Sequence, residues 1–197
     1  LISGSEPAKE TDWDDTLPLY MYGLNPFDNY EGVYQSDLNF QMYWNDDAAK
    51  RQRFLSILDQ ADTIIITSSR QWGSVTQLPE EFPLTTLFYK DLIGCPVEDI
   101  QYCYRVAQPG TYSGSLGFEL VKVYQSNPEI LGVQFNTQFA EEAFTVYDHP
   151  KVLIFKKTDA FNLNDVVNKF YQVDLDKILN LTPEEAEKHT GDLMLST

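Results

Sequence analysis

The sequence predicts an α/β fold: a single three-layer-like domain with a mostly parallel central sheet and an antiparallel hairpin at its edge. Three observations lead to this fold class. Strand-like and helical segments alternate along the chain, as in a sheet covered by helices. The run Thr63-Ile64-Ile65-Ile66-Thr67 is β-branched without alternation, which is typical of a strand covered on both faces. Two later strand-like runs, broken apart by Asn127-Pro128, indicate the antiparallel edge.

Composition narrows the class of protein. The 197 residues suffice for one domain with a substantial core. Thirty acidic residues against 14 basic ones give a net charge of −16. This balance argues against nucleic acid as a partner, because phosphate binding needs clustered Lys and Arg, and against simple adsorption to anionic lipid. No apolar run approaches the roughly 20 residues that span a bilayer, and we expect no signal peptide.

The first elements follow in chain order. Residues 1–45 are rich in aromatic and turn-forming residues, which predicts a long ordered loop or short strands rather than a linker. Asn45, Asp46 and Asp47 then offer N-cap side chains for a helix. Its apolar positions are spaced for one buried face: Phe54, Ile57, Leu58 and Ala61. The isoleucine strand comes next, and we expect residues 64–66 at the centre of the sheet, with this helix and the following one packed on it.

The second half contains further helices and strands. Pro83 starts a helix that Gly94 ends, with an apolar stripe at Leu84, Leu87, Phe88 and Leu92. Residues 94–114 show no period and are interpreted as an inserted loop. Strands are expected at 118–124, 132–135 and 151–157. Asn164 is expected to cap a short helix with Val166, Val167 and Phe170 inward, and Thr182-Pro183-Glu184-Glu185 is a capping box for a last one.

Two polar clusters are candidate binding sites. Trp13, Asp14 and Asp15 could hold a divalent cation or sugar hydroxyls, with the tryptophan as a stacking face. The alternative, which the spacing favours, is a turn whose aspartates cap backbone amides. Ser68, Ser69 and Arg70 follow the isoleucine strand, where open α/β sheets bind ligands. The alternative there is an ordinary polar connection.

No motif for catalysis or for a cofactor is found. The chain contains neither a GxGxxG nor a GxxxxGK[ST] phosphate loop, and no GxSxG nucleophile elbow. We therefore expect no catalytic residue, no metal site and no cofactor. Asp148-His149 precedes a proline in a turn, so His149 is interpreted as a residue that ties the turn together, and it is kept as a candidate substrate contact. Cys95 and Cys103 could be two thiols or a disulfide, which would be stable only in an oxidising compartment.

Three blocks resemble the extracytoplasmic region of bacterial multi-pass membrane glycosyltransferases, relatives of the dolichyl-phosphate-mannose protein mannosyltransferases and of the Chloroflexus-type "YYY" membrane proteins. The first is Trp13-Asp14-Asp15-Thr16-Leu17-Pro18 with its preceding acidic residues. The second runs from Ala61 through Arg70 and on to Phe82-Pro83-Leu84-Thr85-Thr86. The third comprises Leu116 to Val121 and Ala140 to Val152. The resemblance spans roughly residues 3–160, so we expect an extracytoplasmic domain at 1–160 and C-terminal helices with a linker at 161–197.

The sequence departs from the family between the second helix and Leu116. The family passes quickly between these points, whereas residues 94–113 intervene here and contain both cysteines. An extracytoplasmic insertion with two cysteines favours the Cys95–Cys103 disulfide.

The resemblance implies part of an enzyme rather than a whole one. It implies a non-catalytic domain on the extracytoplasmic face of the membrane, which caps the active site or positions a lipid-linked sugar or a glycan acceptor. Its partners would be the flanking transmembrane halves of the same polypeptide, and the isolated chain would be inactive. The alternative is a stand-alone carbohydrate- or metal-binding module that uses Trp13, Asp14 and Asp15. Arg70 would hold a phosphate or pair with Asp14 or Asp15, and both require the two turns to open at the same end of the sheet.

Overall fold

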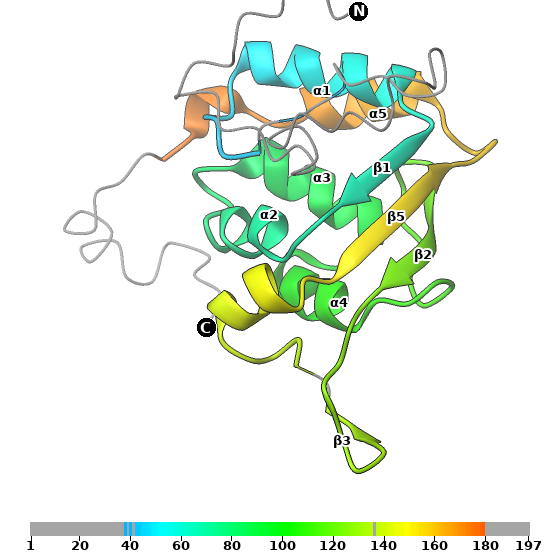
Figure 1. The fold of residues 1–197 in the computed structure, drawn as a ribbon. Helices are drawn as coiled ribbons and strands as arrows, with labels where there is room; N and C mark the ends of the chain where they lie inside the picture. The colour runs from blue at the N-terminus through cyan, green and yellow to red at the C-terminus, as the bar shows by residue number, and fades with distance from the viewer. Residues whose placement is uncertain (1–37, 39, 41, 136, 180–197) are drawn as a thin grey trace, which may run out of the picture. The chain divides into compact units, whose positions relative to one another are not determined.

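Helices and strands are mixed along the described part of the chain, with a run of helices between the first two strands. The structure, a computed structural model, describes residues 38, 40, 42–135 and 137–179. All elements belong to the unit that begins at Met42 (Figure 1). In chain order they are α1 (Ala48–Gln60), β1 (Thr63–Ile66), α2 (Arg70–Gly73), η2 (Val75–Gln77), α3 (Pro83–Ile93), η3 (Val97–Asp99), α4 (Ile100–Val106), β2 (Phe118–Tyr124), β3 (Glu129–Ile130), β4 (Val133–Gln134), η4 (Phe144–Asp148), β5 (Val152–Lys157), α5 (Leu163–Tyr171) and η5 (Leu175–Lys177).

The main sheet contradicts the predicted mostly parallel, three-layer-like arrangement. Its strands are ordered β1-β5-β2, and β5 pairs antiparallel with both neighbours. β1 and β2 therefore run parallel to each other, as the helical connection between them allows. β5 comes later in the chain and lies between them. Local sequence patterns carry no information on where a later strand inserts, so they predict the wrong sheet.

The isoleucine strand lies at an edge of the sheet and not at its centre. Ile66 is buried and pairs with Leu153, but the Ile65 side chain is 40% exposed. β-branched residues suit any pleated, half-buried surface, so an unbroken run of them does not require two covered faces. The central strand is β5, whose Leu153 and Phe155 are almost completely buried.

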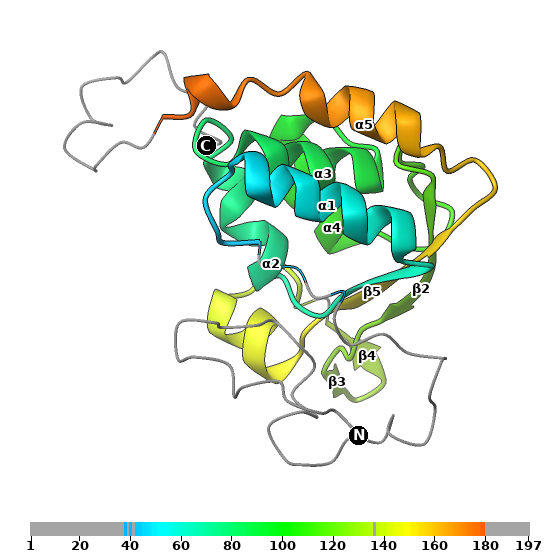
Figure 2. The same ribbon diagram turned by 90° about the horizontal axis from the view of Figure 1, so that it is seen from above.

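The helices gather on one side of this sheet, which gives two layers rather than three (Figure 2). Phe54 of α1 packs against Phe88 of α3, with ring centroids 5.1 Å apart, and against Phe170 of α5 at 5.4 Å. Leu87, expected in the apolar stripe of α3, is only half-buried. The Arg51 guanidinium of α1 donates to the Val173 carbonyl at 2.7 Å, so the segment after α5 is also bound to α1.

Capping residues in the sequence predict the ends of α1 and α3 correctly, and the start of α5 less exactly. Asp47 caps α1 and accepts a hydrogen bond from the Lys50 amide at 2.7 Å, as the sequence predicts. α3 begins at Pro83 and ends at Gly94, whose φ of 86° suits glycine. The cap of α5 is Asn162 and not Asn164, because the Asn162 side chain accepts from the Asn164 amide at 3.0 Å. The predicted capping box at 182–185 lies outside the described residues.

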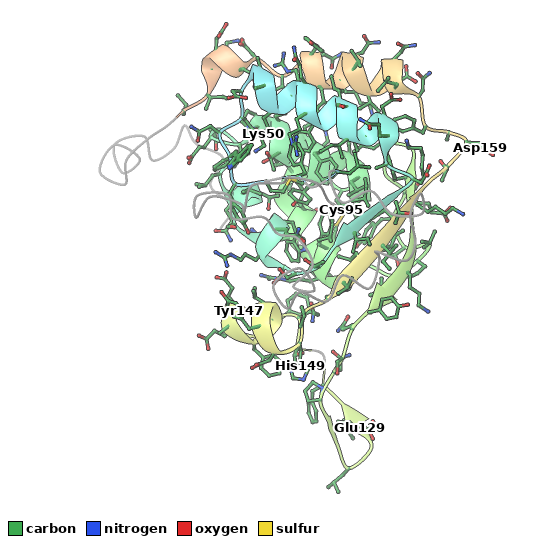
Figure 3. The ribbon with its side chains drawn as sticks, turned by 45° about the horizontal axis from the view of Figure 1, so that its top comes forward. Lys50, Cys95, Glu129, Tyr147, His149 and Asp159 are labelled. Atoms are coloured by element: carbon green, nitrogen blue, oxygen red, sulfur yellow. A yellow bond between two sulfur atoms is a disulfide. The ribbon has the colours of Figure 1, made fainter. Side chains whose placement is uncertain are left out.

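The predicted disulfide is confirmed, and the segment around it is more ordered than an inserted loop. Cys95 and Cys103 are bonded (the yellow bond near Cys95 in Figure 3). The bond joins the end of α3 to α4, a helix that the sequence does not predict. Gly114 passes so close to the Leu92 carbonyl that a Cβ would collide with it. The Ser115 amide then donates to the Asp91 carbonyl at 2.7 Å, which fixes the return of the chain against α3.

A two-stranded hairpin, β3 and β4, forms a separate small sheet after β2. Figures 1 and 3 show it extending away from the three-stranded sheet. Its turn is Leu131-Gly132, with φ values of 53° and 82°. A positive φ costs a residue other than glycine roughly 1–2 kcal/mol. Leu131 is therefore held in an unfavourable backbone conformation at the tip.

Candidate functional site

Three connections meet at one end of the main sheet. Ile66, the last residue of β1, pairs with Leu153 near the start of β5. Tyr124, the last residue of β2, pairs with Val152. The turn after β1 therefore lies at the same end of the sheet as η4, which precedes β5. Antiparallel pairing with β5 thus brings residues 68–70 close to the segment before His149. The sequence predicts another neighbour for residues 68–70, the turn at Asp14 and Asp15 after a parallel strand, and that turn lies outside the described residues.

The turn after β1 is held in shape by Gln71, which is buried. Its Oε1 accepts hydrogen bonds from the Thr67 amide at 2.7 Å and from the Ser68 amide at 3.4 Å. Ser69 is the N-cap residue of α2, but its hydroxyl makes no capping bond and instead donates to Thr145 Oγ1 of η4 at 3.4 Å. Ser69 and η4 are therefore in direct side-chain contact.

Arg70 lies between two tyrosines. The Arg70 guanidinium carbon is 5.9 Å from the centre of the Tyr43 ring, within the range of a cation–π contact. Its Nη1 donates to the Tyr147 hydroxyl at 3.5 Å. Tyr43 in turn donates to the Arg70 carbonyl at 2.5 Å. Among the described residues, no carboxylate forms an ion pair with Arg70. We call Tyr43, Arg70 and Tyr147 the Arg70 cluster.

His149 has a structural environment. Its ring stacks on Phe144 with centroids 4.5 Å apart, and its amide donates to the Phe144 carbonyl at 2.9 Å. Within the described part of the chain, no hydrogen bond joins its ring to Ser68, Ser69 or Arg70, and its buried Nδ1 has no partner. Tyr147 lies in η4, and His149 is the residue that follows its end; Figure 3 labels both. This arrangement agrees with a residue that ties the turn together and does not assemble a nucleophile with a base.

Trp13, Asp14 and Asp15 lie outside the described residues. The predicted pairing of Arg70 with Asp14 or Asp15 therefore stays a prediction. Tyr43 and Tyr147, in contrast, are contacts of Arg70 that sequence reasoning misses. Tyr147 stands in the turn before His149, but no spacing connects Tyr43 to Arg70, which is 27 residues away.

A buried lysine lies beneath the same end of the sheet. The Lys151 side chain is 1% exposed and donates to the carbonyls of Tyr104 at 3.1 Å, Arg105 at 2.9 Å and Ala107 at 2.7 Å. These carbonyls belong to the C-terminal end of α4, which attracts a positive charge. Burial lowers the pKa of Lys151 from 10.5 to about 8. The ammonium group is thus used to cap a helix and is closed to ligands.

A second buried charge stabilises the start of α3. Asp46 accepts hydrogen bonds from the Leu84 amide at 2.6 Å and the Thr85 amide at 2.9 Å, and forms a 2.8 Å ion pair with Lys50. Burial lowers the pKa of Lys50, and the Asp46 carboxylate opposes that change. Asp46 therefore caps a helix 38 residues away, whose own N-cap residue, Phe82, has no side-chain acceptor.

Two further properties bear on function. Among the described residues, no group of three or more His, Cys, Asp or Glu side chains could hold a metal ion. In the same part of the chain, no helix is both long enough and apolar enough to cross a bilayer.

Comparison of the chain with protein-family models, with curated proteins and with solved structures finds no match. The Arg70 cluster and the contacts around it are therefore the basis for a functional assignment.

Proposed function

We propose that the chain is a non-catalytic domain of a membrane-embedded glycosyltransferase, on the extracytoplasmic face, which positions a lipid-phosphate sugar donor. The family resemblance of the motifs suggests this role. The observation that carries it is the Arg70 cluster. Its guanidinium is exposed, faces two tyrosines and forms no ion pair with a described carboxylate, in a chain of net charge −16. A guanidinium in such surroundings suits an anionic ligand from another molecule.

The chemistry of the cluster matches the two parts of such a donor. Arginine binds phosphate oxygens through paired N–H donors. Tyrosine presents a flat apolar ring with a polar hydroxyl, and Tyr147 is 71% exposed. Ser68 and Ser69 directly precede Arg70 in the chain, so their hydroxyls would add hydrogen bonds to a sugar held beside the guanidinium. The cluster contains no nucleophile paired with a base, so the transfer reaction itself would take place in the flanking transmembrane halves of the same polypeptide.

The Cys95–Cys103 disulfide supports the proposed location. Disulfides form and persist in oxidising compartments and are rare in the cytosol. It ties α4 to α3, and α4 carries Tyr104, whose ring stacks on Trp72 of α2 at 5.3 Å. The oxidised bond therefore supports the helix that bears Arg70.

Binding of a phosphorylated sugar by the whole chain tests the proposal. Mannose 1-phosphate and a short-chain polyprenyl-phosphate mannose are titrated into the ¹⁵N-labelled protein, and amide shifts are followed. We expect shifts at residues 68–70 and 145–147. Arg70→Ala should weaken binding by about tenfold or more, the usual loss for a charged hydrogen-bond partner. Arg105→Ala is the matched control, because Arg105 also faces an aromatic ring, Phe139, at 5.7 Å.

Two results would contradict the proposal. Arg105→Ala could weaken binding as much as Arg70→Ala, which would mean that affinity follows overall charge. Arg70→Ala could instead lower the melting temperature without changing affinity, which would make Arg70 a structural clasp.

The second candidate function is a stand-alone carbohydrate-binding module. The exposed tyrosines favour it, since aromatic rings also stack on neutral sugars. The same titration separates the two, because a module of this kind would bind neutral mannose oligosaccharides as tightly as the phosphorylated sugar, and Arg70→Ala would then have little effect.

A further inference from the structure

We propose that the hairpin of residues 129–135 is a docking element that inserts its tip into the interfacial layer of an electrically neutral, phosphatidylcholine-type bilayer. Leu131 at the tip is 100% exposed. Val133 on the returning strand and Phe135 just after it are 56% and 50% exposed. The proposal does not depend on the function proposed for the Arg70 cluster, and the two are tested with different variants.

The tip residue is unsuited to its own turn. Both central residues, Leu131 and Gly132, have positive φ values, of 53° and 82°. Two-residue hairpin turns with this geometry strongly favour Asn-Gly or Asp-Gly. Leucine at the first position contributes neither turn propensity nor packing, because its side chain is fully exposed. Such an outlier indicates that the side chain is used outside the folded chain.

The distribution of charges along the chain favours a neutral lipid surface as the partner of the hairpin. Residues 123–140 contain a single charged residue, Glu129, in a chain that carries 30 acidic and 14 basic residues. A segment with a single charge suits a medium in which charged groups are costly. The net charge of −16 repels both an anionic bilayer and a second copy of the chain. A neutral lipid surface avoids both repulsions.

The order of side chains along the hairpin matches the polarity of a bilayer surface. Aliphatic Leu131 is at the tip, and aromatic Phe135 is further back. Tyr124, which is 57% exposed, stands at the base, where the chain leaves β2. Aliphatic residues favour the hydrocarbon, and tyrosine favours the headgroup layer. Glu129, labelled in Figure 3, lies two positions before the tip and limits the insertion to a shallow one.

Co-sedimentation of the whole chain with phosphatidylcholine vesicles tests the proposal. The wild-type chain should partition to the vesicles, and Leu131→Asn should lower its partition coefficient by about tenfold. Because asparagine suits the turn, the melting temperature of Leu131→Asn should stay equal or rise. Leu78→Asn is the matched control, a leucine that is 43% exposed outside the hairpin, and it should partition like the wild type.

A fluorescent variant gives an independent readout. The emission of Leu131→Trp, corrected for the wild-type signal, should shift to shorter wavelength on adding the same vesicles. Three outcomes would overturn the proposal. The wild-type chain fails to partition, Leu131→Asn partitions like the wild type, or sedimentation equilibrium detects a dimer that Leu131→Asn dissociates. The last outcome would assign the hairpin to a second copy of the chain.

Discussion

At the scale of single residues, the least expected feature is Lys151, a lysine whose ammonium group is buried against backbone carbonyls. The sequence predicts Lys151 as the first residue of a buried strand over 151–157, but no local pattern indicates that its ammonium group is buried as well. It replaces water at three carbonyls around the end of α4, where the helix leaves acceptors unsatisfied. Two opposing effects follow, because the hydrogen bonds stabilise the fold while the loss of hydration destabilises the charged form.

Lys151→Met should destabilise the protein at pH 7 by about 1–3 kcal/mol, because buried carbonyls lose their donor. The difference in free energy of unfolding between the wild type and Lys151→Met should increase at higher pH. The folded-state pKa of Lys151 is about 8, below its ordinary value of 10.5, so the unfolded chain holds more protons between those values. The wild-type free energy of unfolding therefore gains about 2 kcal/mol between pH 7 and 10, which the variant does not gain.

Urea denaturation of both proteins at several pH values measures this effect. Lys156→Met removes an exposed lysine of β5, the strand that follows Lys151, and controls for the loss of one positive charge. A difference that stays constant or narrows as the pH rises would contradict the prediction. It would mean that the three carbonyls keep the pKa of Lys151 near its ordinary value.

At the scale of elements, α3 depends on a cap from outside its own sequence. Pro83 and Gly94 mark its ends in the sequence, but Phe82 at its N-cap offers no acceptor. The acceptor is Asp46, which also pairs with Lys50 in the interior. This shows the limit of local reasoning, because the ends of a helix follow from nearby residues whereas a remote cap depends on the tertiary fold.

Asp46→Ala should lower the free energy of unfolding by about 3–5 kcal/mol, because it leaves the Lys50 ammonium buried without its partner. Adding Lys50→Met should recover part of that loss. Thermal and urea denaturation of the two variants measure both effects. Asp174→Ala removes an exposed carboxylate that pairs with Lys177 at 3.0 Å and caps only the short η5, so it should lower the melting temperature far less. A double variant no more stable than Asp46→Ala would show that the lost cap, and not the buried charge, dominates.

At the scale of the whole molecule, the sequence predicts the elements better than their assembly. The N-cap of α1 and the two ends of α3 agree with the structure, since each depends on residues close in sequence. The disulfide also agrees, and there the family resemblance decided between the two alternatives that the residues left open. The sheet does not, because its order is decided by where β5 inserts. In the candidate site, the sequence predicts neither the contact of Ser69 with η4 nor that of Arg70 with Tyr43. The neighbour that it predicts for residues 68–70, the turn at Asp14 and Asp15, lies outside the described residues.

The strand order of the main sheet leads to a prediction that distinguishes the observed fold from the one that the sequence predicts. If β5 is the central strand, shortening a buried side chain in β5 must lower the free energy of unfolding more than shortening one in the isoleucine strand. Leu153→Ala removes a side chain that is 0% exposed and should lower the free energy of unfolding by about 2–5 kcal/mol. Ile65→Ala removes one that is 40% exposed and should cost less than about 1.5 kcal/mol.

Urea denaturation curves for the two variants, with equal slopes, give the comparison directly. Ile154→Ala is the control within β5, because its half-buried side chain alternates with Leu153 and lies on the opposite face of the strand. Its cost should therefore fall between the other two. A larger loss for Ile65→Ala than for Leu153→Ala would mean that the isoleucine strand is covered on both faces. The antiparallel order β1-β5-β2 would then be wrong, and with it the contact between residues 68–70 and η4 on which the Arg70 cluster depends.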